Sequence, residues 1–101
     1  MSRDLSGGDS ADDARRAAVL RAFVREDGSL RSIPARQHKK VIVLEHLVRL
    51  FTPGVRYPET EVNRILRPCH ADVAALRRYL VQEGLLDREA GVYWRPPATG
   101  Q

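Results

Sequence analysis

The sequence contains only one cysteine, Cys69, in 101 residues. A single cysteine cannot form an internal disulfide, so the fold does not depend on covalent cross-links, which is typical of a reducing compartment. Long hydrophobic runs are also missing, because no stretch approaches the roughly 20 apolar residues of a membrane span. Residues 1–13 lack the apolar run of a signal peptide and carry four aspartates. We therefore expect a cytoplasmic protein.

Motifs for catalysis and for metal binding are absent as well. The three histidines, His38, His46 and His70, fall on separate predicted elements, and no second cysteine accompanies Cys69 at a metal-ligand spacing. There is no glycine-rich phosphate loop. Nothing local predicts that Cys69 and His70 act as a nucleophile pair. We therefore predict a protein that is not an enzyme and that holds no metal ion and no cofactor.

The sequence does supply the composition of one soluble globular domain, with 43% hydrophobic and 30% charged residues. The formal net charge of +4 is unevenly distributed. Residues 1–29 hold five arginines against six acidic residues, whereas residues 30–101 hold twelve basic residues against seven acidic ones. The basic bias therefore belongs to the folded part, and it favours a polyanionic partner.

Hydrophobic spacing in the first half of the chain predicts a helix and a strand. Residues 1–10 are polar and rich in glycine and serine, so we expect a disordered leader. A helix begins at Ala11, and Asp27-Gly28 ends it with a turn. The apolar face of this helix comprises Ala17, Leu20, Phe23 and Val24. Leu30–Ile33 then reads as a short strand that Pro34 stops.

The second half predicts three helices and a hairpin. The helices are Ala35–Phe51, a short one from Pro58 to Pro68, and Cys69–Glu83, for which Gly84 is the expected C-cap. The wide apolar face of Ala35–Phe51 predicts the central core helix. Leu85–Arg95 reads as two short strands around Glu89-Ala90-Gly91, because β-forming residues alternate after a glycine turn. We expect residues 96–101 to form a frayed tail. A single domain over residues 11–95 results.

The fold class that this order predicts is α+β, mainly α. A short strand, three helices and a C-terminal hairpin constitute a winged helix-turn-helix-like core, to which the chain adds an N-terminal helix. The alternative is a plain helical bundle with an irregular tail. The β-forming residues of Val92–Arg95 favour the wing.

Several segments of the chain resemble a bacterial family known as domain of unknown function 2087. They are Leu30–Ala35 leading into Lys39-Lys40, Tyr57–Asn63, Asp72, Leu76–Val81 and Gly84–Arg88. The resemblance extends from about Phe23 to Trp94. It implies a winged-helix domain of a kind found alone or attached to helix-turn-helix regulators. The family has no established activity, so the resemblance strengthens the fold prediction more than any function.

Basic residues gather at the start of the longest predicted helix, where Arg36, His38, Lys39 and Lys40 occur together. Cations near a helix N-terminus oppose the helix dipole, so this cluster is unfavourable unless an anion lies nearby. Free N–H groups and these side chains would suit a phosphate. The other interpretation is a solvated basic edge with no ligand.

The helix Cys69–Glu83 is the candidate recognition helix. Its spacing turns Val73, Leu76 and Leu80 toward the core. The opposite face carries Ala71, Ala75, Arg78 and Gln82, with Ala74 and Arg77 flanking. Asp72 opposes a phosphate contact near the start of the helix. Arg77 has Asp72 and Glu61 as candidate ion-pair partners. General contact with the backbone is therefore favoured over direct reading of bases.

The predicted hairpin adds Arg88 and Arg95, although Asp87 and Glu89 alternate with Arg88. Trp94 is expected to pack rather than to stack on a base, and the same expectation holds for the tyrosines. The N-terminal helix either closes the core or packs against a second copy in a homodimer. The alanines of the candidate recognition helix offer another docking face for a partner protein.

These observations predict nucleic-acid binding, with duplex DNA ahead of RNA, mainly through backbone phosphates and in a role such as transcriptional regulation. The residues expected to contribute are Arg36, Lys39, Lys40, Arg78, Gln82, Arg88 and Arg95. The alternative is a non-catalytic protein–protein interaction domain. No membrane partner is expected.

Overall fold

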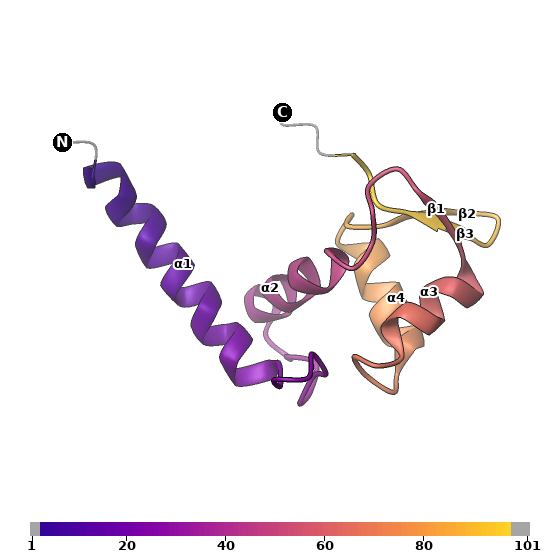
Figure 1. Ribbon diagram of the computed structural model, residues 1–101, viewed down its shortest axis with the longest axis horizontal. Coiled ribbons are helices and arrows are strands. Elements are labelled where there is room, and N and C mark those ends of the chain that lie inside the picture. Colours follow the sequence, from indigo (N-terminus) through magenta and orange to yellow (C-terminus); the bar gives the residue numbers. More distant parts are fainter. Residues whose placement is uncertain (1–2, 98–101) are drawn as a thin grey trace.

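The structure is a computed structural model that describes residues 3–97, with side chains from Ala11 onward. Over this range the chain forms helices α1 (Arg3–Phe23), α2 (Gln37–Val48), α3 (Glu59–Leu66) and α4 (Val73–Gln82), and strands β1 (Arg56–Pro58), β2 (Asp87–Glu89) and β3 (Val92–Trp94). The strands form one antiparallel sheet at the end of the molecule away from α1 (Figure 1). The α+β, mainly α prediction is therefore confirmed. No helix within the described range is long and apolar enough to cross a membrane.

Helix α1 begins at Arg3, eight residues before the start predicted at Ala11, so helix also covers most of the expected leader. Its N-terminal half extends away from the rest of the chain, and its C-terminal half lies against α2 (Figure 1). Val19 is buried, and Leu20, Phe23 and Val24 pack against the core. The predicted apolar face of this helix therefore covers the core of its own chain.

The strand predicted over Leu30–Ile33 does not form, and this prediction was wrong. Val24 and Leu30 make one isolated bridge across the turn at Asp27-Gly28. The Leu30 N–H donates to the carbonyl of Cys69 at 2.7 Å, which ties this segment to the loop between α3 and α4. The Arg31 N–H donates to the Phe23 carbonyl at 2.8 Å, so the backbone of this segment bonds to α1 and to that loop instead of to the sheet. The strand that pairs with the hairpin is β1, between α2 and α3.

Helix α2 is the central core helix, as its wide apolar face predicted. Its buried residues are Ile42, Val43, Leu44, Leu47 and Val48. It is shorter than the predicted Ala35–Phe51, because Arg36 has an extended backbone at one end and tight i→i+3 hydrogen bonds close the other end at Leu50 and Phe51. The ring of Phe51 then meets that of Tyr57 edge to face, with 5.1 Å between their centroids.

The hairpin is confirmed where it was predicted. Strands β2 and β3 pair in the register Arg88–Tyr93, and Tyr93 also pairs with Tyr57 of β1. Ala90 and Gly91 connect the strands with φ angles of 54° and 81°. Positive φ at both central residues is the turn geometry that matches the twist of a two-residue hairpin.

Helix α4 starts at Val73 rather than at Cys69. Asp72 is its N-cap residue, and its Oδ1 accepts a hydrogen bond from the Ala75 N–H at 3.1 Å. At the other end Gly84, with φ +75°, follows the C-cap residue. The N–H groups of Gly84 and Leu85 donate to the carbonyls of Val81 and Leu80, which is the Schellman pattern. The predicted role of Gly84 is therefore confirmed.

Candidate nucleic-acid interface

The basic start of α2 is not capped by any described side chain. Arg36 occupies the N-cap position with φ −76° and ψ 132°, and the first turn contains no acidic residue. Arg36 and His38 are exposed, whereas Lys39 and Lys40 are half-buried. The positive end of the helix dipole and these side chains therefore coincide without a compensating carboxylate in the same turn.

The start of α2 lies beside α4. The Lys40 ammonium is 4.2 Å from the centroid of the Tyr79 ring, and the Arg78 guanidinium carbon is 5.6 Å from the same centroid. Cations within about 6 Å of an aromatic face are attracted to it. The Gln37 amide donates to a carboxylate oxygen of Glu83 at 2.5 Å and joins the same two helices. The fold thus brings Lys40 and Arg78 together around one tyrosine.

The outer face of α4 differs in one residue from the prediction. Arg78, Gln82 and Ala74 are exposed, and so is Ala71, which precedes the helix. Ala75, predicted to face outward, is 7% exposed, so this prediction was wrong. Helix α4 packs against both α2 and α3, and these two contacts bury a wider face than the Val73, Leu76 and Leu80 stripe indicates.

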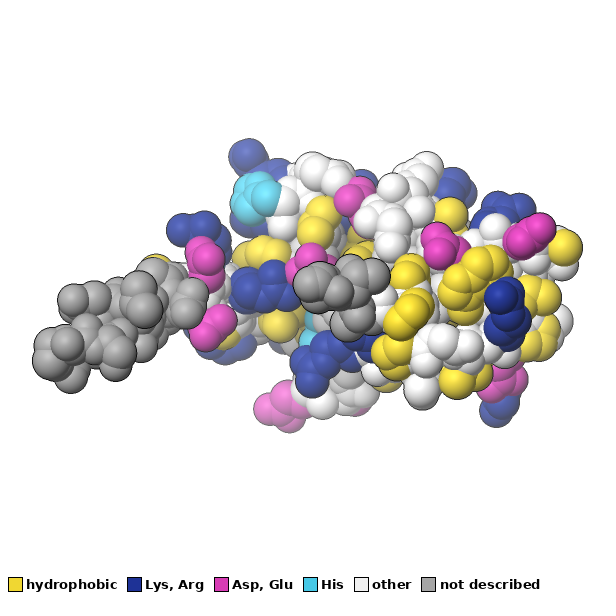
Figure 2. Space-filling model, turned by 90° about the horizontal axis from the view of Figure 1, so that it is seen from above, with side chains coloured by type: hydrophobic (Ala, Val, Ile, Leu, Met, Phe, Trp, Pro, Cys, Tyr) yellow, Lys and Arg dark blue, Asp and Glu magenta, His cyan; other side chains and the backbone are white. Residues whose placement is uncertain are grey.

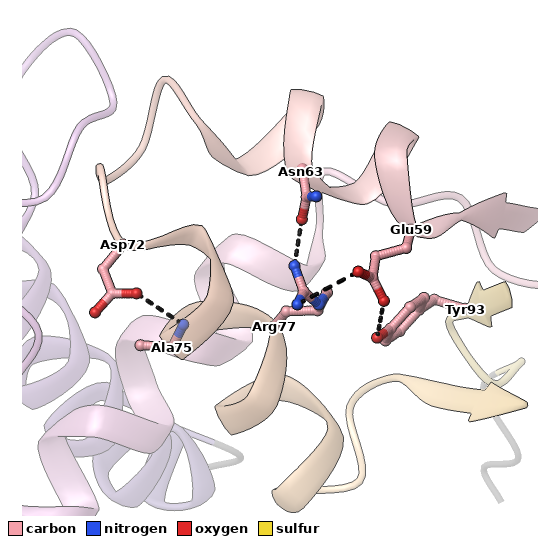
Figure 3. A network of polar contacts seen from close by, with 6 residues as sticks. All are labelled: Glu59, Asn63, Asp72, Ala75, Arg77 and Tyr93. Carbon is pink, nitrogen blue, oxygen red and sulfur yellow. Dashed lines mark hydrogen bonds and ion pairs between the residues drawn. The ribbon is translucent and has the colours of Figure 1, made fainter. Parts of the chain in front are cut away.

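Arg77 is held in a polar network that links α4, α3 and β3 (Figure 3). Its guanidinium donates to the side-chain oxygen of Asn63 and lies 3.6 Å from a carboxylate oxygen of Glu59. The other carboxylate oxygen of Glu59 accepts a hydrogen bond from the Tyr93 hydroxyl at 3.0 Å. The partner predicted for Arg77 was wrong, because Asp72 caps α4 and Glu61 pairs with Arg64 at 2.5 Å.

Arg88 faces α4 because of its register in the sheet. Side chains of directly paired residues share one face, so Arg88 lies on the same side as the buried Tyr93. Its guanidinium carbon is 5.9 Å from the centroid of the Tyr93 ring. Asp87 and Glu89 point to the opposite side, because neighbouring side chains alternate along a strand. The acidic neighbours therefore do not share the surroundings of Arg88.

A hollow of about 260 Å³ lies between α4 and the hairpin, and we call it the arginine hollow. Its polar lining consists of Arg77, Arg78, Arg88, Glu59 and Tyr93. It thus combines the polar network around Arg77 with two of the arginines that the sequence singled out. No local signal in the sequence indicates this arrangement, because the lining residues come from α3, α4 and the hairpin.

Arg95 lies apart from the other candidates. Its guanidinium donates to the carbonyl of Phe51 at 3.1 Å and to that of Val48 at 3.5 Å. The Val48 carbonyl ends α2 and also accepts from the Phe51 N–H at 3.0 Å, and the Phe51 carbonyl lies just beyond the helix. Both lie at the negative end of the helix dipole, which attracts a cation. The observed role of Arg95 is therefore to close α2 against β3.

Hydrophobic side chains gather at the end of the molecule that carries the sheet, with basic side chains among them (Figure 2). Trp94 is half-buried on the outer face of the sheet, where the Arg56 guanidinium carbon lies 4.2 Å from the centroid of the indole ring. Trp94 therefore packs against a side chain of its own sheet, in line with the packing role expected of it.

The remaining titratable side chains in the part of the chain that the structure describes do not form a cluster that could hold a metal ion. Among the described residues no three His, Cys, Asp or Glu side chains cluster. Cys69 is buried, and its burial raises the pKa of the thiol. Burial also lowers the pKa of His46, and the positive charge of Arg49 adds to this effect. The thiol and the imidazole are therefore stabilised in their neutral forms.

Comparison with known proteins identifies the family of this chain. No curated protein and no solved structure matches the chain. The model of a family described as an uncharacterized protein conserved in bacteria matches residues 29–95, the segment that contains α2 to α4 and the whole sheet. The chain therefore belongs to the bacterial family of domain of unknown function 2087.

Proposed function

We propose that this protein binds nucleic acid, with duplex DNA as the first candidate, mainly through backbone phosphates. The observation that carries the proposal is the convergence of cations from three separate segments. Lys40 of α2 and Arg78 of α4 flank the same tyrosine ring, and Arg78 and Arg88 of β2 line the same hollow. We call this the basic surface, and it comprises Arg36, Lys39, Lys40, Arg78, Gln82 and Arg88.

The basic surface supports phosphate contact because its charge is poorly compensated. Among the described side chains, none of its cations has a carboxylate partner within 4.0 Å. The N-terminus of α2 adds free N–H groups and a favourable dipole. Phosphate oxygens accept hydrogen bonds from arginine, from lysine and from helix N-termini, and such contacts carry no sequence information.

The order of the elements also supports this proposal. From α2 onward the chain runs helix, strand, helix, helix and hairpin, and the first strand pairs with the hairpin. We interpret this order as that of a winged helix in which the strand follows the first helix, whereas the sequence predicted the strand before it. In this interpretation α3 and α4 form the helix-turn-helix and β2–β3 form the wing. On α4 only Arg78 and Gln82 offer long exposed donors, so the proposed contacts favour the backbone over the bases.

Fluorescence anisotropy with a generic DNA duplex, titrated at several salt concentrations, tests the proposal. We expect duplex binding that weakens steeply with salt, because neutralised phosphates release counterions. Lys39→Ala/Lys40→Ala should weaken binding equally for unrelated sequences and flatten the salt slope by up to about two, at roughly 0.9 per phosphate contact. The matched control is Arg49→Ala/Arg67→Ala, which removes the same charge from exposed positions elsewhere.

Two results would contradict the proposal. One is no duplex binding even at low salt, and the other is a salt slope in the lysine variant equal to that in the control. The first result favours the second candidate function, which is binding of a protein partner. The observation behind this alternative is Leu50, which is 51% exposed beside an apolar hollow of about 520 Å³ that Leu47, Ile65 and Pro68 help to line.

A further inference from the structure

We infer that the arginine hollow is a phosphate site, in which Arg78 and Arg88 hold one phosphate group between α4 and the hairpin. The inference rests on the proposed function and specifies the point at which a nucleic acid would be anchored. The volume of the hollow, about 260 Å³, is that of several water molecules at roughly 30 Å³ each. A phosphate group with part of its hydration shell therefore fits.

The charges in the hollow favour an anion. Three guanidinium groups line it against one carboxylate, which leaves a net charge of +2. Both oxygens of Glu59 already have partners, one at Arg77 and one at the Tyr93 hydroxyl. Arg78 and Arg88 have no carboxylate within 4.0 Å among the described side chains. A phosphate would relieve the repulsion between these two cations.

Arg77 belongs to the wall of the hollow rather than to the set of free donors. Its side chain is 18% exposed, and its guanidinium is engaged by Asn63 and Glu59. The same carboxylate fixes the hydroxyl of Tyr93, on whose ring Arg88 lies. The network in Figure 3 thus holds the hairpin at a defined position relative to α4. Arg78 on α4 and Arg88 on β2 therefore belong to elements that cannot move apart without breaking this network.

The two free guanidinium groups are also oriented before any ligand arrives. Arg78 lies against the Tyr79 ring and Arg88 against the Tyr93 ring. Guanidinium groups match the oxygens of a phosphate with paired N–H donors, and pre-orientation reduces the entropy lost on binding. A phosphate held by both arginines would set the register of a nucleic acid on the protein without reading its sequence.

Amide-resolved NMR titration with inorganic phosphate tests the inference directly. In the wild-type chain, phosphate should shift the amide signals of residues 77–78, 88 and 93. Arg78→Gln/Arg88→Gln should remove these shifts and weaken phosphate binding at least tenfold, whereas the control Arg49→Gln/Arg67→Gln should retain both. Circular dichroism confirms that both double variants are folded. Shifts that appear elsewhere, or that persist in Arg78→Gln/Arg88→Gln, would overturn the inference.

Nucleic-acid arms of the same experiment identify the source of the phosphate. Duplexes with hydroxyl ends and with 5′-phosphate ends are compared, and equal affinity assigns the site to internal phosphodiesters, whereas tighter binding of the second assigns it to a terminal phosphate. If Lys39→Ala/Lys40→Ala weakens duplex binding and Arg78→Gln/Arg88→Gln does not, the inference fails and the proposed function stands. If inorganic phosphate shifts the amide signals of the arginine hollow but no duplex binds, the phosphate site stands and the proposed function fails.

Discussion

Replacing the N-cap residue of α4 gives a prediction whose size follows from one hydrogen bond. Asp72 is exposed, and its Oδ1 accepts from the Ala75 N–H at 3.1 Å. Asp72→Ala removes this acceptor, which costs about 1 kcal/mol at a typical N-cap. It also removes a negative charge from the positive end of the helix dipole, which adds about 0.3–1 kcal/mol. We therefore expect the free energy of unfolding to fall by roughly 1–2 kcal/mol.

Asp72→Asn separates the two contributions, because asparagine keeps an oxygen acceptor and loses only the charge. We expect it to cost about 0.3–1 kcal/mol. Urea unfolding followed by circular dichroism measures both variants. With a slope of about 1–3 kcal/mol per molar urea, the alanine variant should unfold at a visibly lower midpoint. If the asparagine and alanine variants were equally destabilised, or if neither differed from wild type, the capping argument would be refuted.

Three further predictions concern other parts of the fold. Leu20→Glu should destabilise the domain, because Leu20 packs against the core. If size-exclusion chromatography showed a wild-type dimer and a folded monomer of this variant, α1 would instead be a dimer contact. The free energy of unfolding should fall as the pH drops below about 6.5, because burial and Arg49 lower the pKa of His46 in the folded chain. Below that pH the unfolded chain binds a proton more readily than the folded chain does. Urea titrations at several pH values should show a smaller fall in His46→Gln than in the wild type. Gly84→Ala should lower the free energy of unfolding by about 1 kcal/mol, because alanine is strained at a φ of +75°. No atom lies within 4 Å of the added Cβ, so a steric clash adds nothing to this cost. Thermal unfolding measures the effect, and a variant as stable as wild type would contradict the prediction.

The parts of the fold that could be predicted are those with local signals. Gly84 ends α4 and Gly91 turns the hairpin because few other residues adopt their backbone angles. The apolar stripe of α2 identified the core helix because its period is a property of consecutive residues. Asp72 carried a capping signal, but we interpreted it as a charge opposing phosphate and as a candidate ion-pair partner of Arg77.

The parts that could not be predicted depend on pairing between distant segments. Strand β1 consists of three residues, and only its partner β3 makes it a strand. Arg77 meets Glu59 and Asn63 across the contact between α3 and α4, so its spacing from nearer acids is misleading. The orientation of Arg88 follows from its register with Tyr93. In each case the packing of whole elements, rather than the neighbouring sequence, decides the contact.

The strand order has a consequence for self-association. Because β3 is central, β1 and β2 each leave one side of the backbone without a strand partner. All three residues of β2 are charged and exposed, and β1 ends at Pro58, which has no N–H to donate. Short, charged or proline-bearing edges are the features by which natural sheets avoid joining other chains. The charged side chains of β2 and the missing N–H of Pro58 therefore disfavour strand addition by a second molecule, and the sheet resists polymerisation.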